Sequence, residues 1–295
     1  MTQYSQIQSF LDYLRFEKRY SQHTLISYQN DLEQFFAFLT QYDNLAIEAI
    51  TPIYIRSWLA ELKEESISAK SINRKISALK SFFKFMMKQG VIDQTPMATV
   101  VSPKINKRLP AFVEEKNTNT LFTHVEFSDD WKGKTEWLIL ALFYNTGMRV
   151  SELINLKENQ VDENYGQLKV LGKGNKERII PISKELLTEI KNYVAQKPLR
   201  LEGVTEIFVN EKGKPLYSKY IYNSVKKYLS AVTTLEKKSP HILRHTFATH
   251  LMNNGADLNA VKELLGHSSL AATQVYTHNT IEKLKDIHKK AHPKA

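Results

Sequence analysis

The chain has 295 residues, of which 42% are hydrophobic, with 10 glycines, 9 prolines and no cysteine. This composition is typical of a folded globular protein, and it excludes a disulfide framework and thiolate metal sites. No apolar run reaches the roughly 18 residues that a membrane-spanning helix needs. The first residues lack the basic and apolar regions of a secretory signal, so we expect a cytoplasmic protein.

The net charge is +10 and it is spread along the whole chain. Up to residue 110 there are 14 basic and 10 acidic residues, and beyond it 27 and 21. A single basic tail would indicate an accessory arm, whereas an excess in both halves suits a polyanion held from two sides. Surface lysines that only keep the protein soluble are the alternative explanation.

Apolar residues at helical spacing predict four helices in the first hundred residues. They run over about 4–18, from Ser21 to about Leu39, from Thr51 to about Glu64, and from Ser68 to Gly90. Thr51 followed by Pro52 is a suitable N-cap and first-turn pair, and Gly90 suits the position after a helix end. Four such helices with short loops predict a compact bundle.

The fourth helix has one basic face. Ile72, Ile76 and Leu79 lie on one side, and no acidic residue occurs between residues 70 and 88. The basic residues on the other side are Lys70, Arg74, Lys80, Lys84 and Lys88. Solvated helix faces usually mix both charge signs, so we expect this face to contact the DNA backbone or groove.

A basic, proline-flanked stretch separates the two halves. It reads S-P-K-I-N-K-R-L-P and has no helical period, which is typical of a linker. Its charged residues, Lys104, Lys107 and Arg108, are further candidates for DNA contact. We therefore expect a helical domain over 1–103, a linker over 104–113 and a second domain over 114–295.

The second domain mixes helices with one hairpin. Trp137 to Thr146 reads as a buried helix, and Gly147 marks a turn before Arg149. Two short apolar strands, Leu168–Leu171 and Arg178–Pro181, flank the turn G-K-G-N-K. Further helices are expected over about 184–196, 218–232, 240–254, 257–265, 269–276 and 280–290.

Arg149, Arg244 and Tyr276 indicate chemistry on a phosphate. An arginine presents a planar fork of N–H donors that matches phosphate oxygens. Arg244 lies three residues after His241 on one predicted helix, so both project from the same face near its N-terminus. For Arg149 the alternative is a structural ion pair with Glu152. A tyrosine becomes a nucleophile when a neighbouring group takes its proton.

Five motifs in a fixed order resemble those of the tyrosine recombinases, most of all the bacterial XerC/XerD-type site-specific recombinases. They are R-V-S-E-L at residue 149, G-K-G-N-K-E-R, H-I-L-R-H, L-L-G-H-S and Y-T-H. The resemblance covers nearly the whole chain. It implies a mainly α protein with a small antiparallel β element: an N-terminal four-helix, SAM-like DNA-clamp bundle and a C-terminal α+β catalytic domain.

The resemblance assigns the phosphate chemistry to three of these residues. Arg149 and Arg244 clamp the non-bridging oxygens of the scissile phosphate, and Tyr276 attacks the phosphorus. The product is a 3′-phosphotyrosyl link that retains the phosphodiester energy, so rejoining needs no ATP. Because protein cations offset the charge, we expect no metal and no other cofactor.

Proton transfer is assigned by the same resemblance. Lys173 at the hairpin tip acts as the general acid that protonates the departing 5′ oxygen. His241 and His267 assist proton transfer and donate hydrogen bonds to the phosphate. Which histidine is the general base stays open.

The resemblance also implies an assembly. The apolar helix over about 280–290 inserts into a neighbouring subunit, which links four protomers into a ring. The alternative is packing onto its own domain. The expected partners are duplex DNA with two inverted half-sites, three further subunits in a homotetramer or a heterotetramer with a related recombinase, and a DNA-translocase activator.

Four alternatives accompany the expected role in chromosome or plasmid dimer resolution. The integrase of a mobile element would use the same chemistry, an inactive DNA-binding protein would keep only the fold, and a type IB topoisomerase would not exchange strands between partners. A zinc hydrolase could use His241, His245 and His250, but the motif lacks the glutamate of H-E-x-x-H. The target sequence and the need for a second recombinase stay open.

Overall fold

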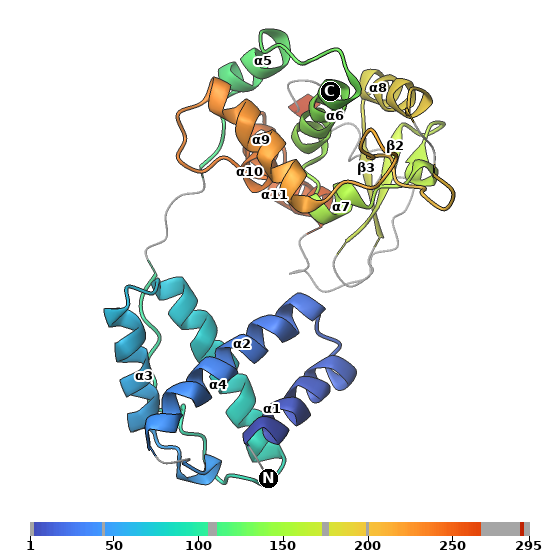
Figure 1. Cartoon of the computed structure of the whole chain (residues 1–295). Helices are drawn as coiled ribbons and strands as arrows, with labels where there is room; N and C mark the ends of the chain where they lie inside the picture. The colour runs from blue at the N-terminus through green and yellow to red at the C-terminus, as the bar shows by residue number, and fades with distance from the viewer. Residues whose placement is uncertain are drawn as a thin grey trace. The chain divides into compact units, whose positions relative to one another are not determined.

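The structure is a computed structural model that describes residues 3–42, 45–105, 111–172, 177–198, 201–266 and 290–291. The chain forms two compact units, Met1–Arg108 and Leu109–Ala295 (Figure 1). In the described part of the chain, no helix combines the length and the apolar character needed to span a bilayer.

The N-terminal unit is the helical bundle that the sequence predicts. Its elements are α1 (Gln3–Asp12), a π-helical turn (Tyr13–Glu17), α2 (Gln22–Leu39), two 3-10 turns (Thr40–Tyr42 and Ile47–Ala49), α3 (Pro52–Glu64) and α4 (Ala69–Lys88). Helix α2 packs against α1, α3 and α4 (Figure 1). The last turn of the first predicted helix is π-helical, because the Lys18 N–H donates to the Tyr13 carbonyl five residues earlier, at 3.1 Å.

Helix α4 begins and ends as its sequence predicts. The Ser68 hydroxyl accepts a hydrogen bond from the Ser71 N–H at 3.2 Å, and Gly90 has a left-handed φ of +68° just after the last turn. At the start of α3, Thr51 holds the N-cap position, but its side chain makes no capping hydrogen bond. Pro52, whose φ is fixed and which has no N–H to satisfy, sets that helix start instead.

Aromatic rings fill the core of this unit. Phe10, Phe35, Phe82 and Phe83 are fully buried, and Trp58 is 2% exposed. Their rings meet mostly edge to face, for example Phe10 against Phe82 with centroids 5.5 Å apart and planes at 85°. Such pairs add to the free energy gained by burying the rings.

A buried ion pair links α2 to α4. Lys75 Nζ lies 3.0 Å from Asp31 Oδ1, and the two side chains are 5% and 1% exposed. Lys75 also donates to Gln34, and Arg74 makes a second ion pair with Asp31. Lys75 lies on the inward face beside Ile76, so it belongs to the core and not to the basic face of α4.

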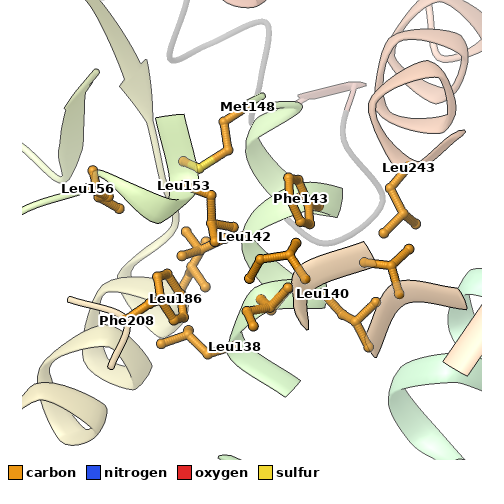
Figure 2. Packing of buried hydrophobic residues seen from close by; sticks show 14 of the residues in the cluster. Leu138, Leu140, Leu142, Phe143, Met148, Leu153, Leu156, Leu186, Phe208 and Leu243 are labelled. Atoms are coloured by element: carbon orange, nitrogen blue, oxygen red, sulfur yellow. The ribbon is translucent and has the colours of Figure 1, made fainter. Parts of the chain in front are cut away.

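The C-terminal unit is built around one long buried helix, α6. Its elements in chain order are α5 (Glu115–Thr123), α6 (Trp131–Thr146), α7 (Val150–Ile154), a 3-10 turn (Glu158–Gln160), β1 (Val161–Asp162), β2 (Gln167–Leu171), β3 (Glu177–Pro181), α8 (Lys184–Ala195), α9 (Ser218–Val232), α10 (Pro240–Asn253) and α11 (Leu258–Leu265). Helix α6 contacts α8, α9 and α10. Its residues Leu138, Leu142 and Phe143 meet Leu186 of α8 and Leu243 of α10 within one hydrophobic core (Figure 2).

The predicted hairpin is present and forms most of a three-stranded antiparallel sheet of order β1-β2-β3. In its register Leu168 pairs with Ile180, and Val170 pairs with Arg178. All four side chains are buried. Because side chains alternate across a strand, Arg178 lies on the same face of the hairpin as Leu168, Val170 and Ile180.

The prediction missed α5 and β1 and placed the start of α6 too late. Helix α5 has few strong helix formers and is held by the burial of Leu121 and Thr118. Helix α6 begins at Trp131 and not at Trp137, because Asp130 Oδ1 accepts a hydrogen bond from the Gly133 N–H at 2.7 Å and caps it. Strand β1 has only two residues and little pattern to detect. The helices predicted over 269–276 and 280–290 lie outside the described residues, except for residue 290.

We expect Asp31→Ala to lower the free energy of opening of α2 and α4 by about 3–5 kcal/mol, because it leaves the Lys75 ammonium buried without its carboxylate. The control, Lys88→Ala, removes an exposed ion pair with Glu17 and should cost about 1 kcal/mol or less. Amide hydrogen exchange in the two helices measures both effects. Equal protection in the two variants would contradict the role of the buried pair.

Candidate active site

The turn between α6 and α7 brings Arg149 to the site. Gly147 ends α6 with a φ of +57°, and a Cβ there would lie 2.5 Å from a ring carbon of Phe247 and 2.8 Å from a methyl of Leu265. Only glycine fits this conformation and this space. Arg149 follows at the N-cap position of α7, with its side chain 29% exposed.

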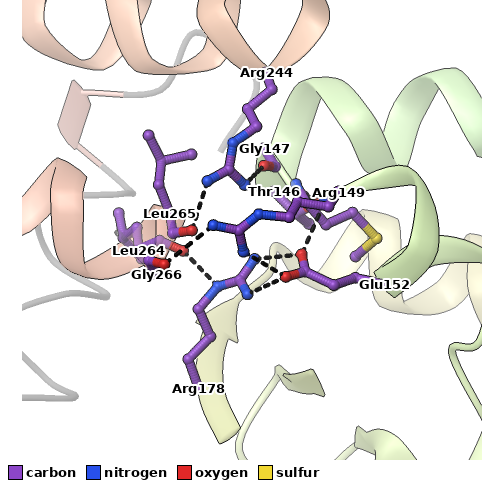
Figure 3. A network of polar contacts seen from close by, with 10 residues as sticks. Thr146, Gly147, Arg149, Glu152, Arg178, Arg244, Leu264, Leu265 and Gly266 are labelled. Carbon is purple, nitrogen blue, oxygen red and sulfur yellow. Dashed lines mark hydrogen bonds and ion pairs between the residues drawn. The ribbon is translucent and has the colours of Figure 1, made fainter. Parts of the chain in front are cut away.

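Glu152 binds two arginines through one carboxylate. Its Oε1 lies 2.7 Å from Arg149 Nη1, and its Oε2 accepts a hydrogen bond from the Arg149 backbone N–H, also at 2.7 Å. Arg178 of β3 binds the same carboxylate in bidentate fashion, at 2.7 Å to each oxygen (Figure 3). Bidentate pairing fixes orientation as well as distance.

The pKa of Glu152 reflects this competition. Burial raises it, but the hydrogen bonds and charge of Arg178, together with the hydrogen bonds of Arg149, outweigh burial and lower the pKa to about 2. Glu152 is therefore ionised throughout the physiological pH range. The ion pair between Arg149 and Glu152, which the sequence offered as the alternative role of Arg149, is present. The Arg149 side chain is nevertheless partly exposed.

Arg244 enters the network from α10. It is 7% exposed, and it donates to the Gly147 carbonyl at 2.5 Å and to the Leu265 carbonyl at 2.6 Å. Burial, followed by repulsion from Arg149 and Arg178, lowers its pKa to about 10. The guanidinium remains charged at neutral pH.

The C-terminus of α11 completes the network. Three successive carbonyls, those of its last two residues and of the C-cap Gly266, each accept a hydrogen bond from one arginine: Leu264 from Arg178 at 2.8 Å, Leu265 from Arg244 at 2.6 Å, and Gly266 from Arg149 at 3.1 Å (Figure 3). A helix C-terminus carries partial negative charge and unpaired carbonyls, which suits cations. The next residue in the chain is His267.

The site has a positive electrostatic balance. Among the described residues, three guanidinium groups, two of them buried, face the single carboxylate of Glu152, an excess of two positive charges. The neighbouring His245 on α10 has a lowered pKa, because of burial first and then repulsion by His241 and Arg244. Such a cluster, which disfavours a further cation, is suited to bind an anion such as a phosphate.

The structure brings two of the six predicted catalytic residues, Arg149 and Arg244, into one network. His241 lies in the first turn of α10 with an exposed side chain. Ser239 holds the N-cap position without a side-chain capping bond, and Pro240 starts the helix. The other three predicted residues, Lys173, His267 and Tyr276, lie outside the described residues.

The sequence prediction did not single out Arg178 as a site residue. It named Glu152 only as an ion-pair partner for Arg149. The alternation in E-R-I-I-P gives the signal for Arg178. It places the arginine on the same strand face as Ile180, where a charge needs a buried partner.

His250 does not support the zinc hypothesis. It is buried, its Nε2 lies 2.9 Å from the Val113 carbonyl oxygen, and its Nδ1 lies 3.1 Å from the Tyr144 hydroxyl. Both ring nitrogens therefore have protein partners. In the described residues no three His, Asp or Glu side chains are grouped as a metal site would require.

The predicted DNA-contacting residues of α4 differ in their surroundings. Lys70, Lys80 and Lys84 are exposed. Arg74 binds Asp31 and the Ser27 hydroxyl, so part of its charge is already offset. Lys88 lies 3.4 Å from Glu17 in an exposed pair. In the linker, Lys104 is exposed, whereas Lys107 and Arg108 lie outside the described residues.

Comparison with known families assigns the chain. Residues 111–283 match the phage integrase family, and residues 7–90 match the SAM-like N-terminal domain of phage integrases. The chain belongs to the phage integrase family. It is 39% identical to the tyrosine recombinase XerC of Listeria innocua over 303 residues, which cover all of both proteins, and 41% identical over 292 residues to XerC of Staphylococcus saprophyticus, with 98% and 97% covered.

Solved structures show the same fold. The chain matches the XerH site-specific recombinase bound to a palindromic difH substrate with a TM-score of 0.73 at 23% identity, covering 96% of this chain and 83% of that one. A lambda integrase dimer bound to a core site gives a TM-score of 0.70 at 20% identity, with 94% and 100% covered. The predicted fold class and the predicted tyrosine recombinase family of the Xer type are confirmed.

The low pKa of Glu152 predicts a pH dependence of stability. A group whose pKa falls from an ordinary 4.5 to about 2 on folding stabilises the fold above pH 4.5, and this contribution is lost as the pH falls toward 2. The stability difference between the wild type and Glu152→Gln should therefore shrink by on the order of 3 kcal/mol over that range. Urea unfolding at several pH values measures it. A difference that stays constant with pH would contradict the assignment.

Proposed function

We propose that this phage integrase family member is a site-specific tyrosine recombinase of the Xer type that cuts and rejoins duplex DNA. The observation that carries the proposal is the network in which Arg149 and Arg244 meet. Two guanidinium groups from distant parts of the chain converge at one place, with an excess of positive charge. The full-length similarity to XerC proteins supports the same function.

In the proposed cleavage step, the phenolic oxygen of Tyr276 attacks the scissile phosphorus. The bond from phosphorus to the 5′ oxygen breaks, and a bond from phosphorus to the tyrosine oxygen forms. The phenolic proton passes to a base, for which His241 and His267 are the candidates, and Lys173 gives its proton to the departing 5′ oxygen. The products are a 3′-phosphotyrosyl link and a free 5′ hydroxyl.

Arg149 and Arg244 supply electrostatic stabilisation in this step. The pentavalent transition state carries more negative charge on its non-bridging oxygens than the phosphodiester does. Fixed cations placed for that charge lower the barrier without reorganising during the reaction. The step needs neither ATP nor a metal ion, because the covalent link retains the bond energy and the arginines offset the charge.

The N-terminal unit is proposed to bind DNA through the basic face of α4. Lys70, Lys80 and Lys84 are exposed there, and they suit contacts to phosphates that carry no sequence information. Arg74, Lys88 and the linker residues Lys104, Lys107 and Arg108 extend this set. The proposed boundaries are 1–103 for the clamp domain, 104–113 for the linker and 114–295 for the catalytic domain.

The working assembly is proposed to be a tetramer on duplex DNA with two inverted half-sites, built from this chain alone or with a related recombinase. The segment over about 280–290 would join neighbouring subunits cyclically. The proposed cellular role is resolution of chromosome or plasmid dimers in the cytoplasm, with a DNA translocase as activator.

Incubation with a nicked recombination site tests the chemistry. The wild type should form a covalent protein–DNA adduct that resists denaturation, and it should do so equally in the presence of EDTA. Tyr276→Phe should bind the site with unchanged affinity but form no adduct, because it lacks the attacking oxygen. An adduct from Tyr276→Phe, or loss of the wild-type adduct in EDTA, would contradict the proposed mechanism.

The role of α4 is tested by the salt dependence of DNA binding. Each phosphate contact contributes about 0.9 to the slope of log K against log salt concentration, because it releases counterions. The double variant Lys80→Gln, Lys84→Gln should reduce this slope by about 2. Lys63→Gln, which removes an exposed lysine of α3, should leave it unchanged. A fluorescence anisotropy titration at several salt concentrations distinguishes the two results, and equal slopes would place the contact elsewhere.

A further inference from the structure

Arg178 is a buried cation at the centre of the arginine network. Its side chain is 4% exposed, and it pairs in the sheet with Val170. Burial of a guanidinium is costly unless its donors are satisfied. Each of its three nitrogens donates to a partner within 2.8 Å: Nη1 and Nη2 to the two oxygens of Glu152, and Nε to the Leu264 carbonyl.

These contacts connect Arg178 to Arg149 through one carboxylate. The Glu152 carboxylate accepts two hydrogen bonds from Arg149, one from the guanidinium and one from the backbone N–H, each at 2.7 Å. Without the fork of Arg178, the buried carboxylate would lose the partner that contributes most to its low pKa. Its orientation, and with it that of the Arg149 guanidinium, would no longer be fixed.

Arg178 also supports the end of α11. Its Nε–H donates to the Leu264 carbonyl, and its Cδ lies close to Gly266. A Cβ on Gly266 would be 2.9 Å from Arg178 Cδ. Gly266 in turn gives its carbonyl to Arg149. The side chain therefore fixes both ends of the contact between Arg149 and α11 (Figure 3).

We propose that Arg178 is a positioning residue for the cleavage step. It holds Glu152, and through it Arg149, in register with the end of α11, so that the Arg149 and Arg244 guanidinium groups converge on one phosphate. Arg178 acts through Glu152 and does not contact the DNA. This inference rests on the proposed recombinase function.

The chain offers a matched control for a role in stability alone. Lys197 is 3% exposed and, like Arg178, binds one carboxylate and one backbone carbonyl: Glu158 at 2.6 Å and Glu206 at 2.7 Å. None of these three residues belongs to the arginine network. Lys197→Met therefore removes a buried, satisfied cation from the same unit without touching the candidate site.

The test measures the single-turnover rate of adduct formation on a nicked site, per folded molecule, together with DNA affinity. Arg178→Lys should cleave roughly 100-fold more slowly than the wild type, because misplacing a catalytic group by about 1 Å has an effect of that size. Its affinity for DNA should change by less than about twofold. Lys197→Met should lower the melting temperature yet cleave within about twofold of the wild type.

A double-mutant cycle decides whether Arg178 acts through Arg149. If it does, the double variant Arg149→Lys, Arg178→Lys should cleave no more slowly than Arg149→Lys alone. The positioning role would be overturned if the rate reductions of the two single variants multiplied in the double variant. A wild-type cleavage rate for Arg178→Lys would also overturn it. No adduct from the wild type would instead overturn the proposed function, and the inference with it.

A second pair of variants leaves residue 178 unchanged and serves if Arg178→Lys does not fold. Gly266→Ala and Gly255→Ala both place a side chain at a left-handed φ, +64° and +87°. Only the Cβ at 266 meets Arg178, whereas nothing lies within 4 Å of the one at 255. Gly266→Ala should cleave at least about tenfold more slowly than Gly255→Ala. Equal rates would overturn the proposal.

Discussion

The candidate site of the C-terminal unit depends on holding three mutually repelling guanidinium groups close together. Two like charges about 4 Å apart repel by roughly 4 kcal/mol near a protein surface. Arg149 lies at the N-cap of α7, Arg178 on β3 and Arg244 on α10. They converge because Glu152 and the carbonyls at the C-terminus of α11 offset that repulsion. Glu152 is ionised at any physiological pH, so this compensation is permanent.

The same arrangement accounts for the site's suitability for a phosphate. Among the described residues, one carboxylate binds the cluster of three cations and leaves it positively charged. The partner groups fix the directions of the arginine forks before any ligand arrives, which is what electrostatic stabilisation of a transition state requires. The site is thus a property of α7, β3, α10 and α11 together, and no single motif contains it.

Features of the fold that follow from local sequence patterns could be predicted. The periodic apolar residues located α2, α3 and α4, the G-K-G-N-K turn located the hairpin, and Gly147 marked the turn before Arg149. Arg178 was missed because its role depends on which residue of another element faces it. Helix α5 was missed because tertiary packing at Leu121, and not intrinsic propensity, makes it helical. The burial of Lys75 could not be predicted either, because it depends on Asp31 of another helix, α2.

Cleavage of a site whose scissile phosphate is replaced by a neutral methylphosphonate tests the central claim most directly. If Arg149 and Arg244 act by offsetting phosphate charge, Arg244→Ala should cleave the natural site about 100-fold more slowly than the wild type. On the methylphosphonate site, where there is less charge to offset, it should approach the wild-type rate. An equal defect on both sites would show that Arg244 does not act on the charge of the phosphate, and would contradict the account.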